Sequence, residues 1–167
     1  MARILIVAGG CRGRQLAAEL AREGHAVRIS TRTEAGRAAI EAAGAECWVG
    51  TPDRLASLRG ALENVTIACW LLATANAGEA ALGALHGSRL QHFLTEVIDT
   101  TVRGFVYEAS PGIVPAQALA GGEQIVRSLG ERNVIPVACL TADPRELDDW
   151  LAQALAAVGS LLSPPAR

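Results

Sequence analysis

The residues best suited to chemistry lie in one stretch near the start of the chain. Residues 4–24 read ILIVAGGCRGRQLAAELAREG, so an aliphatic run breaks into glycines and resumes as an alanine- and leucine-rich segment. Exposed amides at a glycine turn, followed by the amino terminus of a helix, can bind a phosphate group, because N–H donors and the helix dipole both favour an anion. The stretch therefore predicts a phosphate-binding turn.

The spacing of the small residues fits the fingerprint G-x-G-x-x-G of dinucleotide-binding turns. Gly10 takes the second position, where the backbone approaches a diphosphate, and Gly13 takes the third, where the helix packs closely on the strand. Ala8 stands in place of the first glycine. A plain glycine-rich turn is the alternative, but the location between a hydrophobic strand and a helix favours a nucleotide. The predicted contacts are Ala8, Gly9, Gly10, Cys11, Arg12 and Gly13.

Two side chains of this turn carry functional groups. Arg12 occupies a position that is commonly apolar in the fingerprint, so its guanidinium either reaches a phosphate or lies in solvent. Cys11 would be stabilised as a thiolate by the helix terminus, but it would then lie over phosphate rather than over a substrate. The turn therefore predicts binding and identifies no catalytic residue.

The end of the second strand decides which dinucleotide is preferred. An acid there accepts hydrogen bonds from the ribose of NAD(H), whereas an arginine accommodates the 2′-phosphate of NADP(H). The sequence RISTRTEAG places Thr31 and Arg32 at this point and has no acid before Glu34. We therefore expect NADP(H), bound by Arg32 through paired N–H donors with help from Thr31, and NAD(H) as the second choice. An exposed loop arginine is the alternative interpretation of Arg32.

The elements that must position these residues follow a regular alternation. Short apolar runs alternate with segments of helical period, which is typical of an α/β fold with a doubly wound parallel sheet. The expected strands are residues 3–8, 26–30, 45–49, 65–72, 103–108 and 134–140. The expected helices are residues 13–23, 33–43, 52–62, 79–101 (with Gly83 and Gly87 as weak points), 123–131 and a last helix with Asp143 as cap, Pro144 first and Glu146 as reciprocal cap.

Composition limits the classes of function. The 167 residues include 15 basic and 17 acidic side chains, a net charge of -2, and aromatic residues are only 4% of the chain. This balance argues against nucleic acid or a membrane surface as partner. The four cysteines and three histidines lack the spacing of a metal site, so we expect no metal. We expect one domain over residues 1–162, a flexible tail over 163–167 and a cytoplasmic location.

The order of these motifs resembles that of the atypical and extended short-chain dehydrogenases/reductases, including the NAD-dependent epimerase/dehydratase and NmrA-like groups. The likeness covers roughly residues 3–140 and is carried by ILIVAGGCRGRQLA, GHAVRISTR, VGTPDRLASLRGAL, NVTIACWLLATA and VRGFVYEAS. It implies a Rossmann-like sheet of order 3-2-1-4-5-6 and a homodimer through the long fourth helix and its neighbour. It also implies adenine and ribose near Arg32 and Thr51, and nicotinamide near Ala73, Thr74 and Ser110.

The chain departs from the family where the family does chemistry. The family's tyrosine and the lysine four residues later transfer a proton and hold the ribose, but here these positions fall on Pro115 and Leu119 if Glu123 is the acid that follows. The chain has no lysine, and Tyr107, its only tyrosine, lies within the fifth strand and should be packed. The family's Gly-Asp after the third strand is Gly50-Thr51, and its glycine loop is longer.

Two functions stay open from the sequence. The first is a small NADP(H)-dependent reductase or epimerase-like enzyme in which the cofactor carries the chemistry. The second is a cofactor sensor or regulatory protein that keeps the fold without the proton-transfer pair. Glu79 and Glu108 could flank the site, although a solvated Glu79 and an ordinary strand-end Glu108 are the simpler interpretations.

Overall fold

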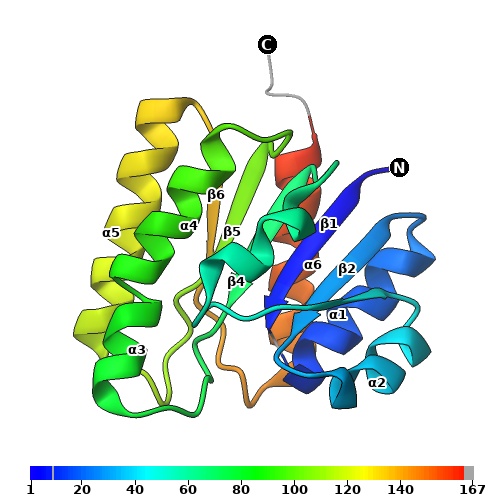
Figure 1. Cartoon of the computed structure of the whole chain (residues 1–167), viewed down its shortest axis with the longest axis horizontal. Helices are drawn as coiled ribbons and strands as arrows, with labels where there is room; N and C mark the ends of the chain where they lie inside the picture. Colours follow the sequence, from blue (N-terminus) through cyan, green and yellow to red (C-terminus); the bar gives the residue numbers. More distant parts are fainter. Residues whose placement is uncertain (9, 164–167) are drawn as a thin grey trace.

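A single six-stranded parallel sheet forms the centre of the molecule (Figure 1). The computed structural model describes residues 1–8 and 10–163. The strand order is β3-β2-β1-β4-β5-β6 and all neighbouring pairs are parallel, which confirms the expected Rossmann-like topology. The strands are β1 Arg3–Ala8, β2 Ala26–Thr31, β3 Glu46–Val49, β4 Ile67–Leu71, β5 Gly104–Glu108 and β6 Val137–Leu140.

Helices cover both faces of this sheet, as parallel strands buried on both sides require. The helices are α1 Gly10–Arg22, α2 Arg37–Ala42, α3 Glu79–Leu85, α4 Ser88–Ile98, α5 Ala116–Asn133 and α6 Leu147–Leu162, with short 3-10 turns at Glu34–Gly36, Leu55–Leu58 and Gly60–Leu62. Helices α1, α2 and α6 pack on one face, and α3, α4 and α5 lie on the other (Figure 1).

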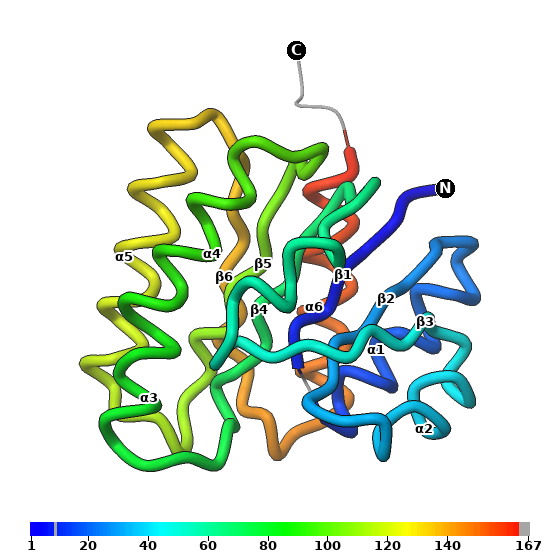
Figure 2. The backbone as a smooth tube through the Cα atoms, viewed as in Figure 1, coloured from blue at the N-terminus to red at the C-terminus, as the bar shows by residue number. Residues whose placement is uncertain are grey.

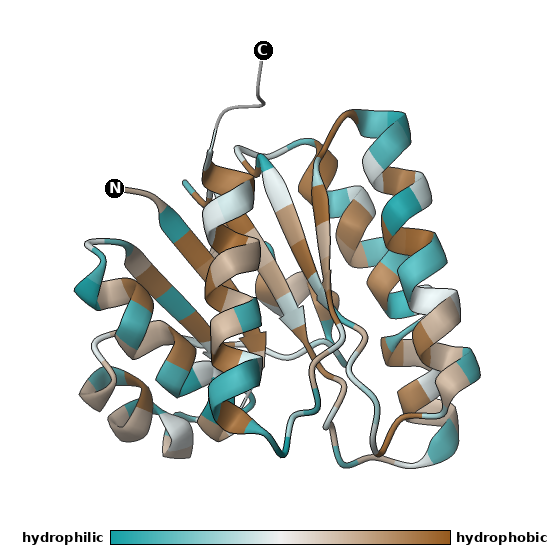
Figure 3. Ribbon diagram, turned by 180° about the vertical axis from the view of Figure 1, so that it is seen from behind, coloured by the Kyte–Doolittle hydropathy of each residue, from teal (hydrophilic) through white to brown (hydrophobic). Residues whose placement is uncertain are grey.

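Alternation along β1 builds the core on both faces at once. Ile4 and Ile6 pack toward the α1 and α6 face, whereas Leu5 and Val7 pack toward the α4 face, and all four are fully buried. Figure 3 shows largely apolar strands between helices that carry hydrophilic and hydrophobic residues in alternation. The apolar runs that predicted the strands are therefore the two-sided core of a parallel sheet.

The expected helix over residues 52–62 is wrong. This segment forms the two 3-10 turns Leu55–Leu58 and Gly60–Leu62 instead. The Trp48 indole N–H donates to the Ser57 carbonyl oxygen at 2.7 Å, which uses an acceptor that an α-helix would need. The Trp48 ring also lies so close to Gly60 that a Cβ there would be 2.6 Å from it. A tertiary contact has therefore replaced the helical pattern.

The expected single helix over residues 79–101 is divided into α3 and α4. His86 and Gly87 separate them, because the buried His86 ring hydrogen-bonds to the Leu72 carbonyl oxygen after β4 and to the Tyr107 hydroxyl of β5. The break lies at one of the two glycines that the sequence marked as weak points. The interruption follows from a side chain that is held elsewhere in the fold.

The starts of the last two long helices also differ from expectation. Helix α5 begins at Ala116 rather than at residue 123. It includes Gly121 and Gly122, which the sequence interpretation had placed before the helix. Helix α6 begins at Leu147, after Glu146, without a side-chain cap. The expected cap Asp143 instead accepts hydrogen bonds from the backbone and guanidinium of Arg145, the latter at 2.7 Å.

All the carboxyl ends of the strands lie at one end of the molecule, opposite the amino terminus (Figure 2). The turns from β1 to α1, from β4 to α3, from β5 to α5 and from β6 to α6 meet there. Over residues 1–8 and 10–163, no helix combines the length and the apolar character that a membrane span needs. Residues 164–167, most of the expected tail, lie outside the described part of the chain.

Candidate functional site

The turn between β1 and α1 has the backbone that close approach to a ligand requires. Ala8 has φ +64° and Gly10 has φ +53°, the left-handed region that favours glycine. A Cβ on Gly13 would lie 3.0 Å from the Ala8 carbonyl oxygen and 3.4 Å from Ile6 Cγ2, so Gly13 lets the helix pack on the strand, as the fingerprint predicts. Gly9, one of the predicted contacts, lies outside the described residues.

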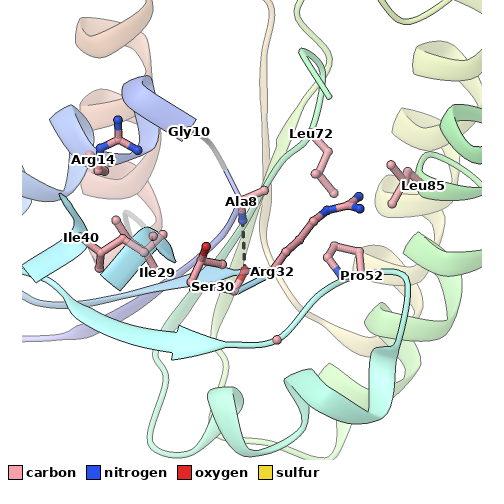
Figure 4. A pocket seen from close by; sticks show the side chains of 13 residues that line it. Ala8, Gly10, Arg14, Ile29, Ser30, Arg32, Ile40, Pro52, Leu72 and Leu85 are labelled. Carbon is pink, nitrogen blue, oxygen red and sulfur yellow. Dashed lines mark hydrogen bonds between the residues drawn. The ribbon is translucent and has the colours of Figure 1, made fainter. Parts of the chain in front are cut away.

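A cavity of about 290 Å³ opens beside this turn, where the strand order reverses between β1 and β4 (Figure 4). Ligands of open α/β sheets bind at such a reversal, because the loops on either side diverge and leave a crevice. The lining residues are Ala8, Gly10, Arg14, Ile29, Ser30, Thr31, Arg32, Gly36, Ile40, Gly50, Pro52, Leu72 and Leu85. The predicted residues Ala8, Gly10, Thr31 and Arg32 therefore share one cavity; Arg14 was not predicted.

A second cavity, of about 680 Å³, begins on the other side of the same turn. It is bounded by the ends of β1, β4, β5 and β6, and Gly10 lines both cavities. The lining residues are Gly10, Cys11, Arg12, Thr74, Pro111, Gly112, Ile113, Asp143, Pro144 and Arg145. An elongated molecule that crosses Gly10 can therefore occupy both cavities at once.

Other predicted contacts lie near these cavities without lining them. Thr51 stands between Gly50 and Pro52, which line the first cavity. Ala73 and Ser110 are fully buried in the protein. The Ser110 hydroxyl oxygen has no hydrogen-bond partner among the residues that the structure describes. Of the three residues predicted to lie near nicotinamide, Thr74 is the one that lines a cavity.

The alternative that the Arg12 guanidinium lies in solvent is wrong. Only 12% of its side chain is exposed, and its guanidinium forms an ion pair with Glu108. Its second terminal nitrogen donates to the Thr74 hydroxyl at 2.7 Å, and the guanidinium carbon lies 4.5 Å from the centre of the Trp150 ring. The arginine therefore ties the turn between β1 and α1 to β4, β5 and α6.

Glu108 is a buried ion-pair partner rather than the ordinary strand-end residue of the simpler interpretation. Its carboxylate is fully buried and accepts hydrogen bonds from Arg12, from the Trp150 indole N–H at 2.9 Å and from the Ala73 amide at 3.0 Å. A buried charge is stable only when it is paired and hydrogen-bonded, and all three donors meet that need here. One signal was available, since an acid directly after the apolar run GFVY predicts a buried charge that needs a partner.

Arg32 is exposed but not free. Its side chain is 66% exposed, and one terminal nitrogen lies 2.8 Å from an Asp53 carboxylate oxygen. The other Asp53 oxygen accepts a hydrogen bond from Arg89 of α4 at 3.2 Å. Asp53 therefore offers Arg32 a counter-charge within the protein.

Tyr107 is packed in the core, as its position in the strand predicted. Its hydroxyl lies 2.7 Å from His86 Nδ1, and His86 Nε2 lies 3.2 Å from the Leu72 carbonyl oxygen. Because a carbonyl can only accept, Nε2 carries the proton and Nδ1 accepts from the tyrosine hydroxyl. Burial lowers the pKa of His86 and raises the pKa of Tyr107. This neutral pair is a structural contact, and neither of its residues lines either cavity.

The cysteines are all free thiols, and they differ in exposure. Cys11 is exposed at the start of α1, Cys47 and Cys69 are buried, and Cys139 is half-buried. Burial raises the pKa of Cys69 to about 12 and that of Cys139 to about 11, which disfavours a thiolate at either position. Within the described ranges, no cluster of three or more His, Cys, Asp or Glu side chains could hold a metal ion.

Comparison by sequence finds no matching family model and no matching curated protein. Comparison by structure finds UDP-glucose 4-epimerase from Thermotoga maritima, solved with UDP-glucose, at TM-score 0.69 and 14% identity over 83% of this chain and 54% of that one. UDP-glucuronic acid 4-epimerase from Bacillus cereus, solved with NAD and a substrate analogue, has TM-score 0.64 and 12% identity over 83% and 55%.

Triphenylmethane reductase from Citrobacter sp., complexed with NADP(H), has TM-score 0.63 and 17% identity over 83% of this chain and 48% of that one. This chain therefore spans about half the length of these structures. The likeness shows that this chain shares the Rossmann-like fold of these two epimerases and this reductase, as the resemblance implied. One of these neighbours holds NAD and another NADP(H).

Proposed function

We propose that this chain is an NADP(H)-binding protein in which the diphosphate crosses the turn at Gly10. The observation that carries the proposal is that Gly10 lines both cavities at the point where the strand order reverses. The adenosine half of the cofactor would occupy the first cavity. The nicotinamide half would extend toward Thr74 in the second.

The choice of NADP(H) over NAD(H) rests on the charge of the first cavity. Its titratable lining side chains are Arg14 and Arg32, and neither Asp nor Glu is among the described residues that line it. The ribose of NAD(H) is usually recognised by an acid at the end of β2, whereas an added phosphate is recognised by arginine. The cavity therefore suits the phosphorylated cofactor.

Two functions are compatible with this binding. In the first, a small reductase, the cofactor supplies the hydride and the protein positions an acceptor in the second cavity. In the second, a sensor, binding alone is the function. The sensor is favoured by the core position of the only tyrosine, Tyr107, and by the absence of lysine from the chain.

Thermal unfolding with separate additions of NADP(H), NAD(H), FAD and S-adenosylmethionine tests the binding proposal. A ligand that binds only the folded state raises its melting temperature. We expect the largest rise with NADP(H); no rise with either pyridine nucleotide would contradict the proposal. Oxidation of NADPH with added flavin or quinone acceptors then separates the reductase, which consumes it, from the sensor, which does not.

The cytoplasmic location and the homodimer through α4 and α5 remain parts of this proposal. The two helices pack side by side on one face of the sheet, where a second copy could add two more. Light scattering of the purified chain measures its mass in solution. A mass of one chain would remove the dimer from the proposal and leave cofactor binding unaffected.

A further inference from the structure

Arg14 is a cation in the first cavity that the sequence did not predict as part of a site. It lies in the first turns of α1, and its half-buried side chain lines the cavity together with Ile29, Gly36 and Ile40. Within residues 1–8 and 10–163, no ion pair or hydrogen bond involves its guanidinium. A guanidinium that lines a cavity in this way presents its N–H donors to whatever occupies it.

Arg32 lies at the opposite end of the cavity in different surroundings. Figure 4 shows Arg14 beside Ile40 and Ile29, well separated from Arg32, which extends toward the end formed by Pro52, Leu72 and Leu85. The carboxylate of Asp53 and the guanidinium of Arg89 also lie at that end, because Asp53 forms ion pairs with both Arg32 and Arg89.

The two ends of the cavity therefore favour different parts of a nucleotide. A phosphate dianion beside Arg32 would face the Asp53 carboxylate and would have to displace it. Beside Arg14 it would meet a guanidinium without a protein counter-charge, and the Thr31 hydroxyl lines the same cavity. An aromatic base suits the other end, because apolar side chains and the face of a guanidinium both pack on a flat ring.

We propose that Arg14, assisted by Thr31, binds the 2′-phosphate of the adenosine ribose, and that Arg32 packs against the adenine base. This inference rests on the proposed NADP(H) binding and reassigns the role that the sequence gave to Arg32. The specificity for the phosphorylated cofactor then depends on α1. Arg32 contributes to the affinity for both cofactors alike.

Calorimetric titration of the full chain with NADP(H) and NAD(H), and with adenosine 2′,5′-bisphosphate and adenosine 5′-monophosphate, tests this division. We expect Arg14→Ala to weaken NADP(H) and the bisphosphate about tenfold to a hundredfold while it leaves NAD(H) and the monophosphate unchanged. Arg32→Ala should weaken all four by a similar factor. The control Arg22→Ala removes an exposed arginine from the far end of α1 and should change none.

Three results would overturn the inference. If Arg14→Ala leaves the ratio of NADP(H) to NAD(H) affinity unchanged in a folded variant, Arg14 does not read the phosphate. If Arg32→Ala alone removes the preference, the phosphate lies at the Asp53 end. If the unaltered chain binds neither cofactor, the proposed function fails as well, so the two failures are distinguishable.

Discussion

Glu108 links three segments that no local pattern connects. Its donors Arg12, Ala73 and Trp150 lie 96, 35 and 42 positions away in the sequence. Removal of one partner from a buried pair leaves an uncompensated charge, whereas removal of both does not. The carboxylate therefore fixes the start of α1 relative to β4 and α6, and with it the shape of the second cavity.

Glu108→Met is expected to lower the free energy of unfolding by about 3–5 kcal/mol, because buried Arg12 then lacks its counter-charge. The double variant Arg12→Met/Glu108→Met should lose less than this single variant. Glu19→Met, which breaks an exposed ion pair with Arg22 on α1, should cost less than about 1 kcal/mol. Urea unfolding measures all three, and equal losses for Glu108→Met and Glu19→Met would refute the role of the buried pair.

Ala8 gives a prediction of the opposite sign. Its φ of +64° is unfavourable for a residue with a side chain, so Ala8→Gly should raise the free energy of unfolding by up to about 1 kcal/mol. Ala18→Gly, within α1, should lower it by about 1 kcal/mol because glycine weakens a helix interior. Denaturant unfolding of both variants gives the signs. A loss of stability in Ala8→Gly would contradict the backbone assignment.

At the scale of elements, the strands were predictable and the helix limits were less so. The apolar runs locate β1 to β6 to within a few residues because both faces of each strand are buried, and that leaves a continuous signal in the sequence. The helical limits depend on contacts between distant segments. Trp48 interrupts residues 52–62 and His86 interrupts residues 79–101, and neither contact can be deduced from local spacing.

The same limit applies to the candidate site. The positions of Gly10 and Gly13 follow from a fixed spacing, so the location and the close packing of the turn were predictable from the sequence. Arg14 and Asp53 enter only when the helix and the loop after β3 are folded beside the end of β2. The sequence could name an arginine after β2 but could not show that it carries a counter-charge.

Two adjacent glycines of helix α5, Gly121 and Gly122, should respond in opposite ways to substitution by alanine. A Cβ on Gly122 would lie 2.7 Å from Tyr107 Cζ and 3.0 Å from the His86 carbonyl oxygen, whereas nothing lies within 4 Å of a Cβ on Gly121. Gly122→Ala should therefore lower the free energy of unfolding by about 1–3 kcal/mol. Gly121→Ala should raise it by up to about 1 kcal/mol. Thermal or urea unfolding that ranked the two in reverse would show that α5 packs differently.

At the scale of the whole molecule, the buried His86 makes stability depend on pH. Burial lowers its pKa in the folded state, so the unfolded chain takes up a proton first as the pH falls through about 6.5. Stability is therefore retained at neutral pH and lost toward acid. Urea unfolding at several pH values measures this dependence. Between about pH 7.5 and about pH 5.5, the free energy of unfolding should change less with pH in His86→Gln than in the unaltered chain.

The order of the strands in the sheet creates the two cavities that a dinucleotide would occupy. The reversal of strand order places the turn at Gly10 between a cavity with two arginines and a larger one bounded by the ends of β4, β5 and β6. A dinucleotide has the matching form, with an adenosine and a nicotinamide half joined by a diphosphate.

A crystal structure of the chain grown in excess NADP⁺ tests the central claim most directly. We predict density for the diphosphate against the backbone of the turn at Gly10, with adenosine between Arg14 and Arg32 and nicotinamide beside Thr74. Crystals that diffract well and hold no nucleotide at the carboxyl ends of β1 and β4, or hold it elsewhere on the molecule, would contradict it.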